Sequence, residues 1–255
     1  MITKSHMNIL IAANTTWYIH NFRSRLIAAL IERGHLVTAL APRDEYVSRI
    51  EASGARHLHL ELDRAGVNPL SELSTLAHLT TLLRREKPTL ILTNTTKGNI
   101  FVSLAARLLG IPVVTNISGL GRAYIAGGWL KTITRQLYKM AMKHPRLIFF
   151  QNEDDRKEFT RGGIVDWDKT ARLPGSGVDL ERFAPAVTRS AGRHFVFLLA
   201  ARLLWDKGVG EFVQAARQVK SRYPETEFRL LGFLDVQNRS AIPRAVIESW
   251  ETEGV

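Results

Sequence analysis

Residues 7–41 read MNILIAANTTWYIHNFRSRLIAALIERGHLVTALA, and this stretch decides the fold class. It begins with an unbroken apolar run at 7–13, continues into an amphipathic segment from about 19 to 33, and reaches a second apolar run at 35–41. Short apolar runs on both sides of a helix are typical of strands that are buried on both faces of a parallel sheet. The stretch therefore predicts a β–α–β unit with a right-handed crossover.

The same alternation continues along the chain to about residue 173. Further strands are expected at 55–62, 89–93, 113–117, 147–151 and 170–173. Further helices are expected at 44–52, 70–86, 98–109, 129–143 and 153–161. Strands that alternate with helices in this way predict an α/β fold, with a parallel sheet between layers of helices.

A second β–α–β pattern follows a polar segment at 174–193 that is rich in proline and glycine. Such a composition is typical of an interdomain hinge. The pattern consists of strands at 195–200 and 227–231 and helices at 209–222 and 240–253. A Rossmann-type domain normally has five or six strands. We therefore expect a complete Rossmann-like domain at 7–187 and only the first part of a second one at 188–255.

Composition narrows the class of protein. The chain has 255 residues and no cysteine, which excludes disulfides and thiolate metal sites and is typical of a reducing compartment. No apolar run approaches the roughly 18 residues of a membrane span, and the first residues do not resemble a signal peptide. Residues 1–6 precede the first strand and take no part in the fold argument. We expect a cytoplasmic protein.

The charge is basic and unevenly placed. The net charge is +11, and the stretch 87–152 contains nine Lys or Arg and no Asp or Glu. Such a field favours polyanions: nucleic acid, anionic lipid or substrates that carry a pyrophosphate. The usual RNA-binding and helix-turn-helix signatures are absent, so no nucleic-acid partner is expected.

Two cations stand where the second unit turns from its first strand into its first helix. Arg202 follows the strand, and Lys207 precedes the helix. Ligands bind open α/β sheets at the carboxyl ends of the strands, and helix N-termini favour anions there. The pair is a candidate grip for a diphosphate leaving group, although a surface ion pair and a solvated lysine are the alternative.

Two glycine turns are further candidates for ligand contact. Gly119 and Gly121 follow the strand at 113–117, and Gly175 and Gly177 lie in the hinge. Glycine lets backbone amides approach a ligand closely. The first turn lacks the third glycine of a dinucleotide-binding motif, which makes a nicotinamide enzyme a poor interpretation. A turn without ligand contact is the alternative for each.

The expected helix at 129–143 is basic along one side. Its basic residues recur at i, i+4 spacing: Lys131, Arg135, Lys139 and Lys143. Beside them runs an apolar face: Leu130, Ile133, Leu137 and Met140. Like charges four residues apart repel each other, and anionic lipid headgroups would compensate them. A surface helix docked on the sheet is the alternative. Lys97, after the strand at 89–93, either faces the ligand crevice or is a solvated lysine.

Metal and hydrolase motifs are not found. Asp166-Trp167-Asp168 has the spacing of a metal–nucleotide motif, but it precedes a strand instead of following one. The eight histidines lack metal-ligand spacing, and no Ser-His-Asp pattern is visible. No metal or other cofactor is expected.

Several ordered motifs together resemble the family 4 glycosyltransferases of the metal-independent, two-Rossmann-domain type known as GT-B. The chain is especially similar to bacterial transferases, such as N-acetylgalactosaminyltransferases, that act on polyprenyl-diphosphate-linked glycans. The matching stretches are Lys97–Phe101, Leu104–Arg107, Gly110–Pro112, Ser118–Gly121, Gln151–Asp155, Pro174–Asp179, Arg182–Phe183, Ala201–Arg202 and Lys207–Gly208.

The resemblance implies roles for these residues. Arg202 and Lys207 would hold the diphosphate of a nucleotide sugar, such as a UDP-sugar, and the two glycine turns would line the donor cleft. The N-terminal domain, with Lys97 and the basic helix, would face an anionic membrane and receive a lipid-linked glycan. Transfer would retain the anomeric configuration, at the inner face of the cytoplasmic membrane. The enzyme would serve cell-surface polysaccharide or glycoconjugate synthesis.

Two features depart from the family pattern. Ser118 stands where many members have a histidine that contacts the sugar. The family's paired-glutamate segment would fall beyond Val255, so the chain alone is expected to have negligible activity. A sugar-nucleotide epimerase of the same architecture and a non-catalytic module that binds membranes or polyanions remain as alternatives.

Overall fold

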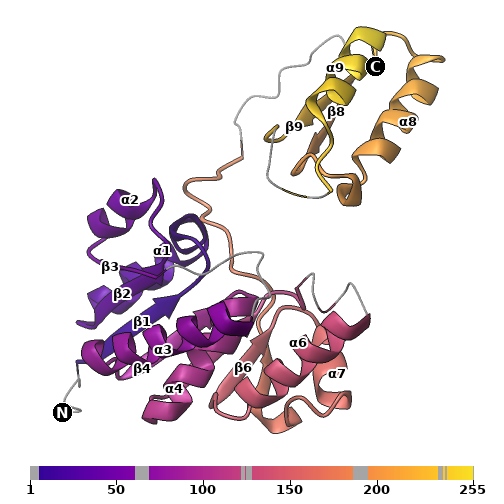
Figure 1. Cartoon of the computed structure of the whole chain (residues 1–255). Helices are drawn as coiled ribbons and strands as arrows, with labels where there is room; N and C mark the ends of the chain where they lie inside the picture. The colour runs from indigo at the N-terminus through magenta and orange to yellow at the C-terminus, as the bar shows by residue number, and fades with distance from the viewer. Residues whose placement is uncertain are drawn as a thin grey trace. The chain divides into compact units, whose positions relative to one another are not determined.

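A computed structural model gives the architecture in two compact units, Met1–Leu180 and Glu181–Val255 (Figure 1). The residues that it describes are 6–60, 69–121, 124, 128–185, 195–234, 238 and 240–254. The predicted domain boundary after residue 187 lies outside these described residues. Each unit is described by itself below.

Unit 1 contains a seven-stranded sheet in which all neighbouring strands are parallel, in the order β3-β2-β1-β4-β5-β6-β7. The strands are β1 (Asn8–Ala12), β2 (Leu36–Ala41), β3 (Arg56–His59), β4 (Leu90–Asn94), β5 (Val113–Ile117), β6 (Leu147–Phe150) and β7 (Thr170–Arg172). The predicted α/β class and parallel sheet are confirmed. The predicted strand at 55–62 ends at His59, and residues 61 and 62 are not described.

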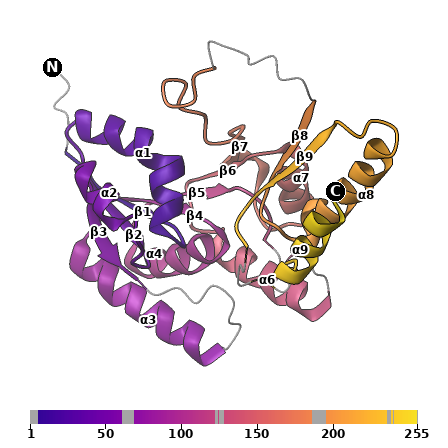
Figure 2. The same ribbon diagram turned by 90° about the horizontal axis from the view of Figure 1, so that it is seen from above.

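Helices cover both faces of this sheet. They are α1 (Thr16–Glu32), α2 (Val47–Ala52), α3 (Pro69–Glu86), α4 (Ser103–Leu109), α6 (Gly128–Ala141) and α7 (Glu153–Arg161). One apolar core joins the sheet to α1 and α2 through residues such as Ile27 and Ile50, and a second joins it to α3, α4, α6 and α7. Figure 2 shows α1 and α3 on opposite sides of β1–β4.

Helix α1 starts three residues earlier than its apolar pattern predicts, because its first turn is capped. The Thr15 hydroxyl accepts a hydrogen bond from the Tyr18 amide at 2.9 Å, and the Asp44 carboxylate accepts from the Thr16 amide at 3.0 Å and from the Trp17 amide at 3.3 Å. Side-chain oxygens at this position satisfy amides that have no partner within the helix.

The strand order reverses between β1 and β4, which makes their carboxyl ends the topological switch point of unit 1. Ligands of open α/β sheets bind in the crevice at such a point. The chain leaves β4 through Thr95, whose φ of 68° is unusual for a β-branched residue. A π-helical turn, Gly98–Val102, then precedes α4. Such turns are frequent at functional sites, so the predicted helix at 98–109 begins irregularly at this crevice.

Unit 2 is small. Its described strands β8 (Val196–Ala200) and β9 (Glu227–Leu231) are parallel, and α8 (Val209–Lys220) and α9 (Arg244–Glu253) complete the pattern that the sequence predicts. The core includes Leu203, Val209, Ile242 and Ile247. Helix α9 starts later than predicted because Pro243, which has no amide hydrogen, stands at its N-cap.

Candidate functional site

Arg202 and Lys207 lie at the carboxyl end of β8, as the sequence predicts. Both side chains are exposed, and neither forms an ion pair with another described residue of the chain. The segment between β8 and α8 contains one helical turn, Trp205–Lys207, and Gly208 caps the helix with a φ of 74°. The left-handed region favours glycine at that position. Two uncompensated cations therefore stand beside the first turn of a helix.

Buried side chains and hydrogen bonds to a neighbouring segment hold the backbone between Arg202 and Lys207. Leu203 and Leu204 are buried, the Ile242 amide donates to the Leu203 carbonyl at 3.0 Å, and the Trp205 amide donates to the Ser240 carbonyl at 2.9 Å. Gly232, directly after β9, packs against the Ala201 carbonyl so closely that a Cβ would clash. The sequence analysis missed Gly232, because nothing in the local pattern shows which backbone it would approach.

In the glycine turn after β5, packing inside unit 1 requires a glycine at one of the two positions. Gly121 has a φ of 82°, and a Cβ there would stand 2.5 Å from the hydroxyl oxygen of Thr96. Gly119 has open space around its Cβ position, so only its backbone is left available for a ligand. The structure places both glycines at the carboxyl edge of the sheet, next to the switch point.

The second glycine turn follows β7. Gly175 and Gly177 have φ values of 84° and 77°, and nothing lies within 4 Å of either Cβ position. Backbone conformation therefore requires these glycines. Between them, the Ser176 hydroxyl accepts a hydrogen bond from the Arg23 guanidinium at 2.9 Å. Sequence reasoning missed Arg23, since a cation in an amphipathic helix is ordinarily solvated.

Lys97 lies after β4, but its ammonium group is already engaged. Its Nζ stands 2.6 Å from Oε1 of Glu72 in the first turn of α3, and both side chains are largely buried. The predicted contact of Lys97 with an acceptor therefore stays a prediction, and it would have to compete with this ion pair.

The basic side of α6 divides into two halves. Lys131 contacts Glu158 of α7 at 3.8 Å and lies over the Tyr124 ring, 4.9 Å from its centroid. Arg135 donates a hydrogen bond to the Gly162 carbonyl. These two cations tie α6 to α7. Among the described residues, no ion pair engages Lys139 or Lys143 in the other half.

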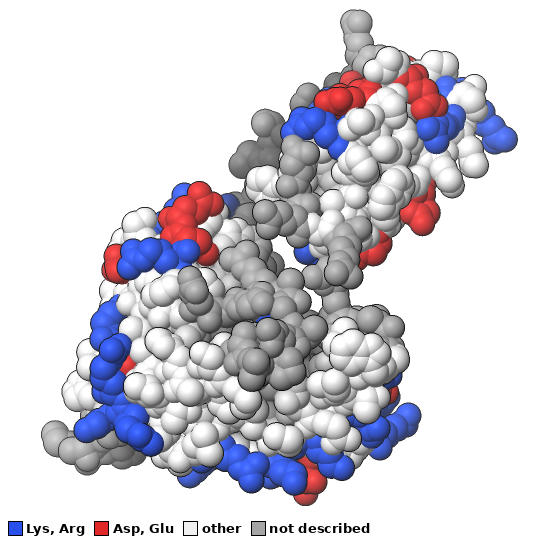
Figure 3. Space-filling model, viewed as in Figure 1, with Lys and Arg blue, Asp and Glu red and all other residues white. Residues whose placement is uncertain are grey.

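Lys139, in the last turn of α6, and Lys143, two residues after the helix ends, line a cavity of about 430 Å³ together with Lys169. Lys169 also lies 3.8 Å from Asp166. Figure 3 shows Lys and Arg side chains along the lower rim of unit 1, with few acidic side chains among them. Lys139 and Lys143 are exposed, so this end of the predicted basic stripe is open to an anionic partner.

Only part of the apolar face predicted beside the stripe packs on the core: Leu137 contacts it. The fully buried residues of α6 are Thr134, Tyr138 and Ala141. Ile133 and Met140 are about half exposed, and Trp129 is 68% exposed. Burial raises the pKa of the Tyr138 phenol to about 12. The helix therefore presents apolar side chains to solvent.

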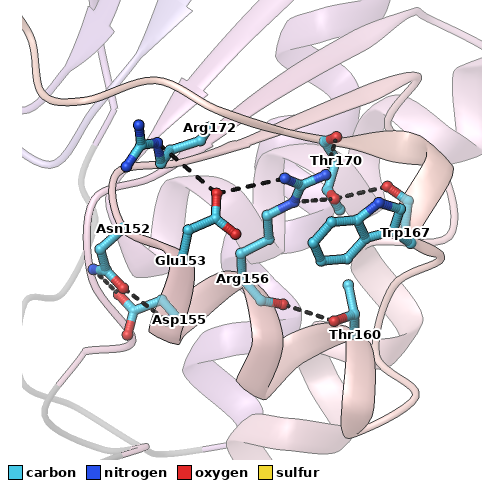
Figure 4. Close-up of polar contacts among 8 residues, drawn as sticks. All are labelled: Asn152, Glu153, Asp155, Arg156, Thr160, Trp167, Thr170 and Arg172. Atoms are coloured by element: carbon cyan, nitrogen blue, oxygen red, sulfur yellow. Dashed lines mark hydrogen bonds and ion pairs between the residues drawn. The ribbon is translucent and has the colours of Figure 1, made fainter.

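The stretch Gln151–Asp155 has a structural role at the start of α7 (Figure 4). The Asn152 side chain caps the helix by accepting from the Asp155 amide at 2.7 Å. Three acidic residues in the first turn suit the positive end of the helix dipole. Figure 4 also shows Glu153 near two guanidinium groups, 3.5 Å from Arg156 and 3.8 Å from Arg172.

Arg156 ties α7 to the edge strand of the sheet. Its Nε donates to the Thr170 hydroxyl at 2.8 Å, and its guanidinium lies 3.5 Å from the centroid of the Trp167 ring. Trp167 is the middle residue of the Asp166–Asp168 stretch, which forms part of a short helical turn before β7. Within the described part of the chain, no group of three His, Asp or Glu could hold a metal ion.

No described helix has both the length and the apolar character that are needed to cross a membrane.

Two curated relatives are similar in sequence. The chain is 30% identical over 233 residues to N,N'-diacetylbacillosaminyl-diphospho-undecaprenol alpha-1,3-N-acetylgalactosaminyltransferase of Campylobacter jejuni, covering 85% of this chain and 61% of that protein. It is 29% identical over 185 residues to UDP-Gal:alpha-D-GlcNAc-diphosphoundecaprenol alpha-1,3-galactosyltransferase of Escherichia coli, covering 68% of this chain and 47% of that protein. The chain thus spans about half to three fifths of the length of these relatives.

Solved structures share the fold at low sequence identity. Anabaena HepE, in complex with UDP and glucose, has a TM-score of 0.65 at 16% identity, over 89% of this chain and 70% of that chain. The UDP-GlcNAc 2-epimerase of Neisseria meningitidis has a TM-score of 0.62 at 14% identity, over 97% of this chain and 70% of that one. These similarities confirm the predicted GT-B-type architecture.

The family model named "Glycosyl transferase 4-like domain" matches residues 19–176. This range contains the carboxyl end of β4, the first glycine turn and Gly175 of the second, and it covers more than half of the chain. The resemblance drawn from the ordered motifs is therefore confirmed: the chain belongs to the glycosyl transferase 4-like family.

Proposed function

We propose that the protein is a retaining glycosyltransferase that moves a sugar from a nucleotide-sugar donor, such as a UDP-sugar, to a polyprenyl-diphosphate-linked glycan. The product would enter cell-surface polysaccharide or glycoconjugate synthesis. Family membership carries the proposal. The names of both curated relatives support it, because each describes a transferase that acts on a diphospho-undecaprenol-linked sugar.

Arg202 and Lys207 would receive the donor's diphosphate. Negative charge gathers on that group as its bond to the sugar breaks, and fixed cations stabilise the charge most in the transition state. The exposure of both side chains and their lack of a described ion-pair partner support this role. With two such cations no metal ion would be needed.

Retention of configuration follows from attack on the face that the leaving group departs from. The acceptor hydroxyl oxygen forms a bond to the anomeric carbon as the carbon–oxygen bond to the phosphate breaks. The hydroxyl proton passes to an oxygen of the departing diphosphate. Such a reaction needs no protein base, and it suits a family site in which cations, not carboxylates, are prominent.

The lipid-linked acceptor would be met at a membrane surface by unit 1. Exposed Trp129, Ile133 and Met140 on α6 would enter the headgroup region, with Lys139 and Lys143 beside them. Apolar insertion combined with basic residues is how amphipathic helices bind anionic bilayers. The protein would thus lie at the inner face of the cytoplasmic membrane, and Lys131 and Arg135 would hold α6 in place.

A transfer assay tests the proposal. The chain would be assayed as it stands and after lengthening with the C-terminal part of the Campylobacter jejuni relative beyond the matched region, using UDP-sugars and an undecaprenyl-diphosphate-linked glycan. We expect transfer with retained configuration from the lengthened protein, in the presence of a chelator, and negligible transfer from the 255-residue chain. Absence of transfer from a folded lengthened protein would count against the proposal.

An epimerase is the second candidate, because epimerases are among the structures that share the fold. The same reaction mixtures distinguish the two activities: an epimerase changes the free UDP-sugar and leaves the glycan unaltered. Binding to anionic vesicles with neither activity would indicate a non-catalytic binding module.

A further inference from the structure

Unit 1 buries a cation at its switch point. Arg23 of α1 is only 8% exposed. All five of its N–H groups donate hydrogen bonds: Nε and one terminal nitrogen to Asn94 Oδ1 at 3.1 and 2.8 Å, and the others to the Phe22 carbonyl at 2.9 Å, the Ser176 hydroxyl at 2.9 Å and the Tyr18 hydroxyl at 3.1 Å.

Every one of these partners is neutral. Among the described residues, no Asp or Glu comes within ion-pair distance of the Arg23 guanidinium. A buried charge without a counter-charge is costly, and an arginine keeps its charge because its pKa lies far above neutral pH. The hydrogen bonds of the guanidinium must therefore offset the cost of burying its charge. Because Asn94 and Ser176 lie far from Arg23 in sequence, these bonds also join distant segments of the chain.

Asn94 connects Arg23 to the first glycine turn. It ends β4, and its amide nitrogen lies 3.4 Å from the Ala12 carbonyl of β1, across the switch point. Its Oδ1 also accepts from the Asn116 side chain at 3.4 Å, near the end of β5. Gly121, four residues after Ile117, then packs on Thr96, two residues after Asn94. One side-chain oxygen thus lies between Arg23 and the base of this turn.

Ser176 connects Arg23 to the second glycine turn. The Ser176 hydroxyl lies between Gly175 and Gly177, and nothing lies within 4 Å of the Cβ position of either glycine. The remaining described support within the turn is a hydrogen bond from the Gly175 amide to the Leu173 carbonyl at 2.8 Å. Arg25 of the same helix holds Asp179, two residues after the turn, at 3.0 Å. Within the turn itself, the described side-chain contact with another segment is the hydrogen bond from the Arg23 guanidinium.

We propose that Arg23 is a positioning residue that sets both glycine turns, Ser118–Gly121 and Pro174–Gly177, from a single buried point at the switch point of unit 1. The role of these turns in donor binding rests on the proposed function; their common anchoring does not. Lysine cannot replace Arg23, because one ammonium group lacks the planar fork that spans Asn94, Ser176 and Tyr18.

Backbone hydrogen exchange in the 255-residue chain tests the anchoring without any turnover. In Arg23→Lys and Arg23→Met, amides of both turns should exchange about tenfold faster or more, as expected when hydrogen bonds of ordinary strength are lost. In Ser176→Ala, only the Pro174–Gly177 turn should exchange faster. Arg33→Met, at the exposed end of the same helix, is the matched control and should leave both turns unchanged.

Rescue by added guanidinium ion distinguishes a positioning role of Arg23 from a general effect on the stability of unit 1. In Arg23→Ala, added guanidinium ion should restore protection of both turns, whereas sodium chloride at the same ionic strength should not. In the transfer assay of the lengthened protein, Arg23→Lys should raise KM for the nucleotide sugar severalfold while the melting temperature changes little.

The outcomes that would overturn the proposal are distinct from those that would overturn the enzyme class. Unchanged exchange in both turns of Arg23→Lys, or a uniform increase over all of unit 1, would show that Arg23 does not position them. Selective loosening without any transferase activity would leave the anchoring intact and refute the proposed function instead.

Discussion

The α-carbon of Gly232 lies against the backbone carbonyl oxygen of Ala201, and no Cβ atom fits between the two residues. Because Ala201 directly precedes Arg202, this contact fixes where the chain leaves β8. We expect Gly232→Ala to destabilise the protein by about 1–3 kcal/mol, the usual cost of overpacking, and to displace Arg202. Urea unfolding measures the loss.

Gly98→Ala is the matched control for that substitution. A Cβ on Gly98 would stand 3.4 Å from the Thr95 hydroxyl oxygen, an ordinary contact, and the backbone there is not left-handed. Its stability should stay within about 0.5 kcal/mol of the wild type. Equal stability of the two variants would show that β9 does not press on Ala201.

Asp44 makes the stability of unit 1 sensitive to acid. Burial by itself would raise its pKa, but hydrogen bonds from the Thr16 hydroxyl and from the amides of Tyr46, Trp17 and Thr16 outweigh that effect and lower it. A lowered pKa contributes stability that is present above the unfolded value, about 3.8, and is lost as the pH falls through the folded value.

Asp44→Asn should therefore cost about 0.5–2 kcal/mol at neutral pH, the range for a lost helix cap. The difference from the wild type should shrink as the pH is lowered through about 3.8. Urea unfolding at pH 7 and near pH 3 measures both effects. A difference that is independent of pH would contradict the role of the carboxylate.

Two tyrosines should resist alkaline ionisation. Burial, followed by the hydrogen bond to Glu158, raises the pKa of Tyr124 from 10.0 to about 12, and burial raises that of Tyr138 to about 12. A raised pKa contributes stability that is present below pH 10 and is lost as the pH rises toward 12. The phenolate absorbance should show both rings still protonated at about pH 11.

Replacement by phenylalanine identifies the two rings in that titration. Tyr124→Phe and Tyr138→Phe should each remove one late-titrating phenol. Ionisation of Tyr124 and Tyr138 near pH 10 in the folded protein would show that these two rings are not buried as described.

Lys139 and Lys143, the exposed end of the basic stripe, should determine the affinity of the protein for anionic vesicles. Lys139→Gln and Lys143→Gln should each weaken binding about fivefold at low salt, since a basic residue near an anionic surface contributes about 1 kcal/mol. Lys131→Gln is the control, because Lys131 already contacts Glu158 and Tyr124. Equal effects at all three positions would contradict the division of the stripe.

The sequence was a good guide to the strands of this fold. A strand buried on both faces must be apolar at nearly every position, so the runs at 7–13, 35–41 and 113–117 could be recognised without any partner. The strand order and the break in the helix at Gly98–Val102 depend on contacts between distant segments, which local patterns do not contain.

Individual side chains of the candidate site were harder to predict. Periodicity grouped Ile133 and Met140 of α6 on one apolar face, but it did not show that Tyr138 and Ala141 are the residues that face the core. Local charge gave no sign that Lys97 meets Glu72 of α3. Arg23 was overlooked for the same reason: two of its partners, Asn94 and Ser176, come from β4 and from the turn after β7.

The most direct test of the account is sugar transfer by the lengthened protein with Arg202 or Lys207 replaced by methionine. If both cations stabilise the departing diphosphate, Arg202→Met and Lys207→Met should each lower kcat/KM about ten- to a hundredfold, as loss of a charge-assisted contact implies, with the melting temperature unchanged. Transfer at the wild-type rate by either folded variant would contradict the central claim that these two residues form the donor's phosphate grip.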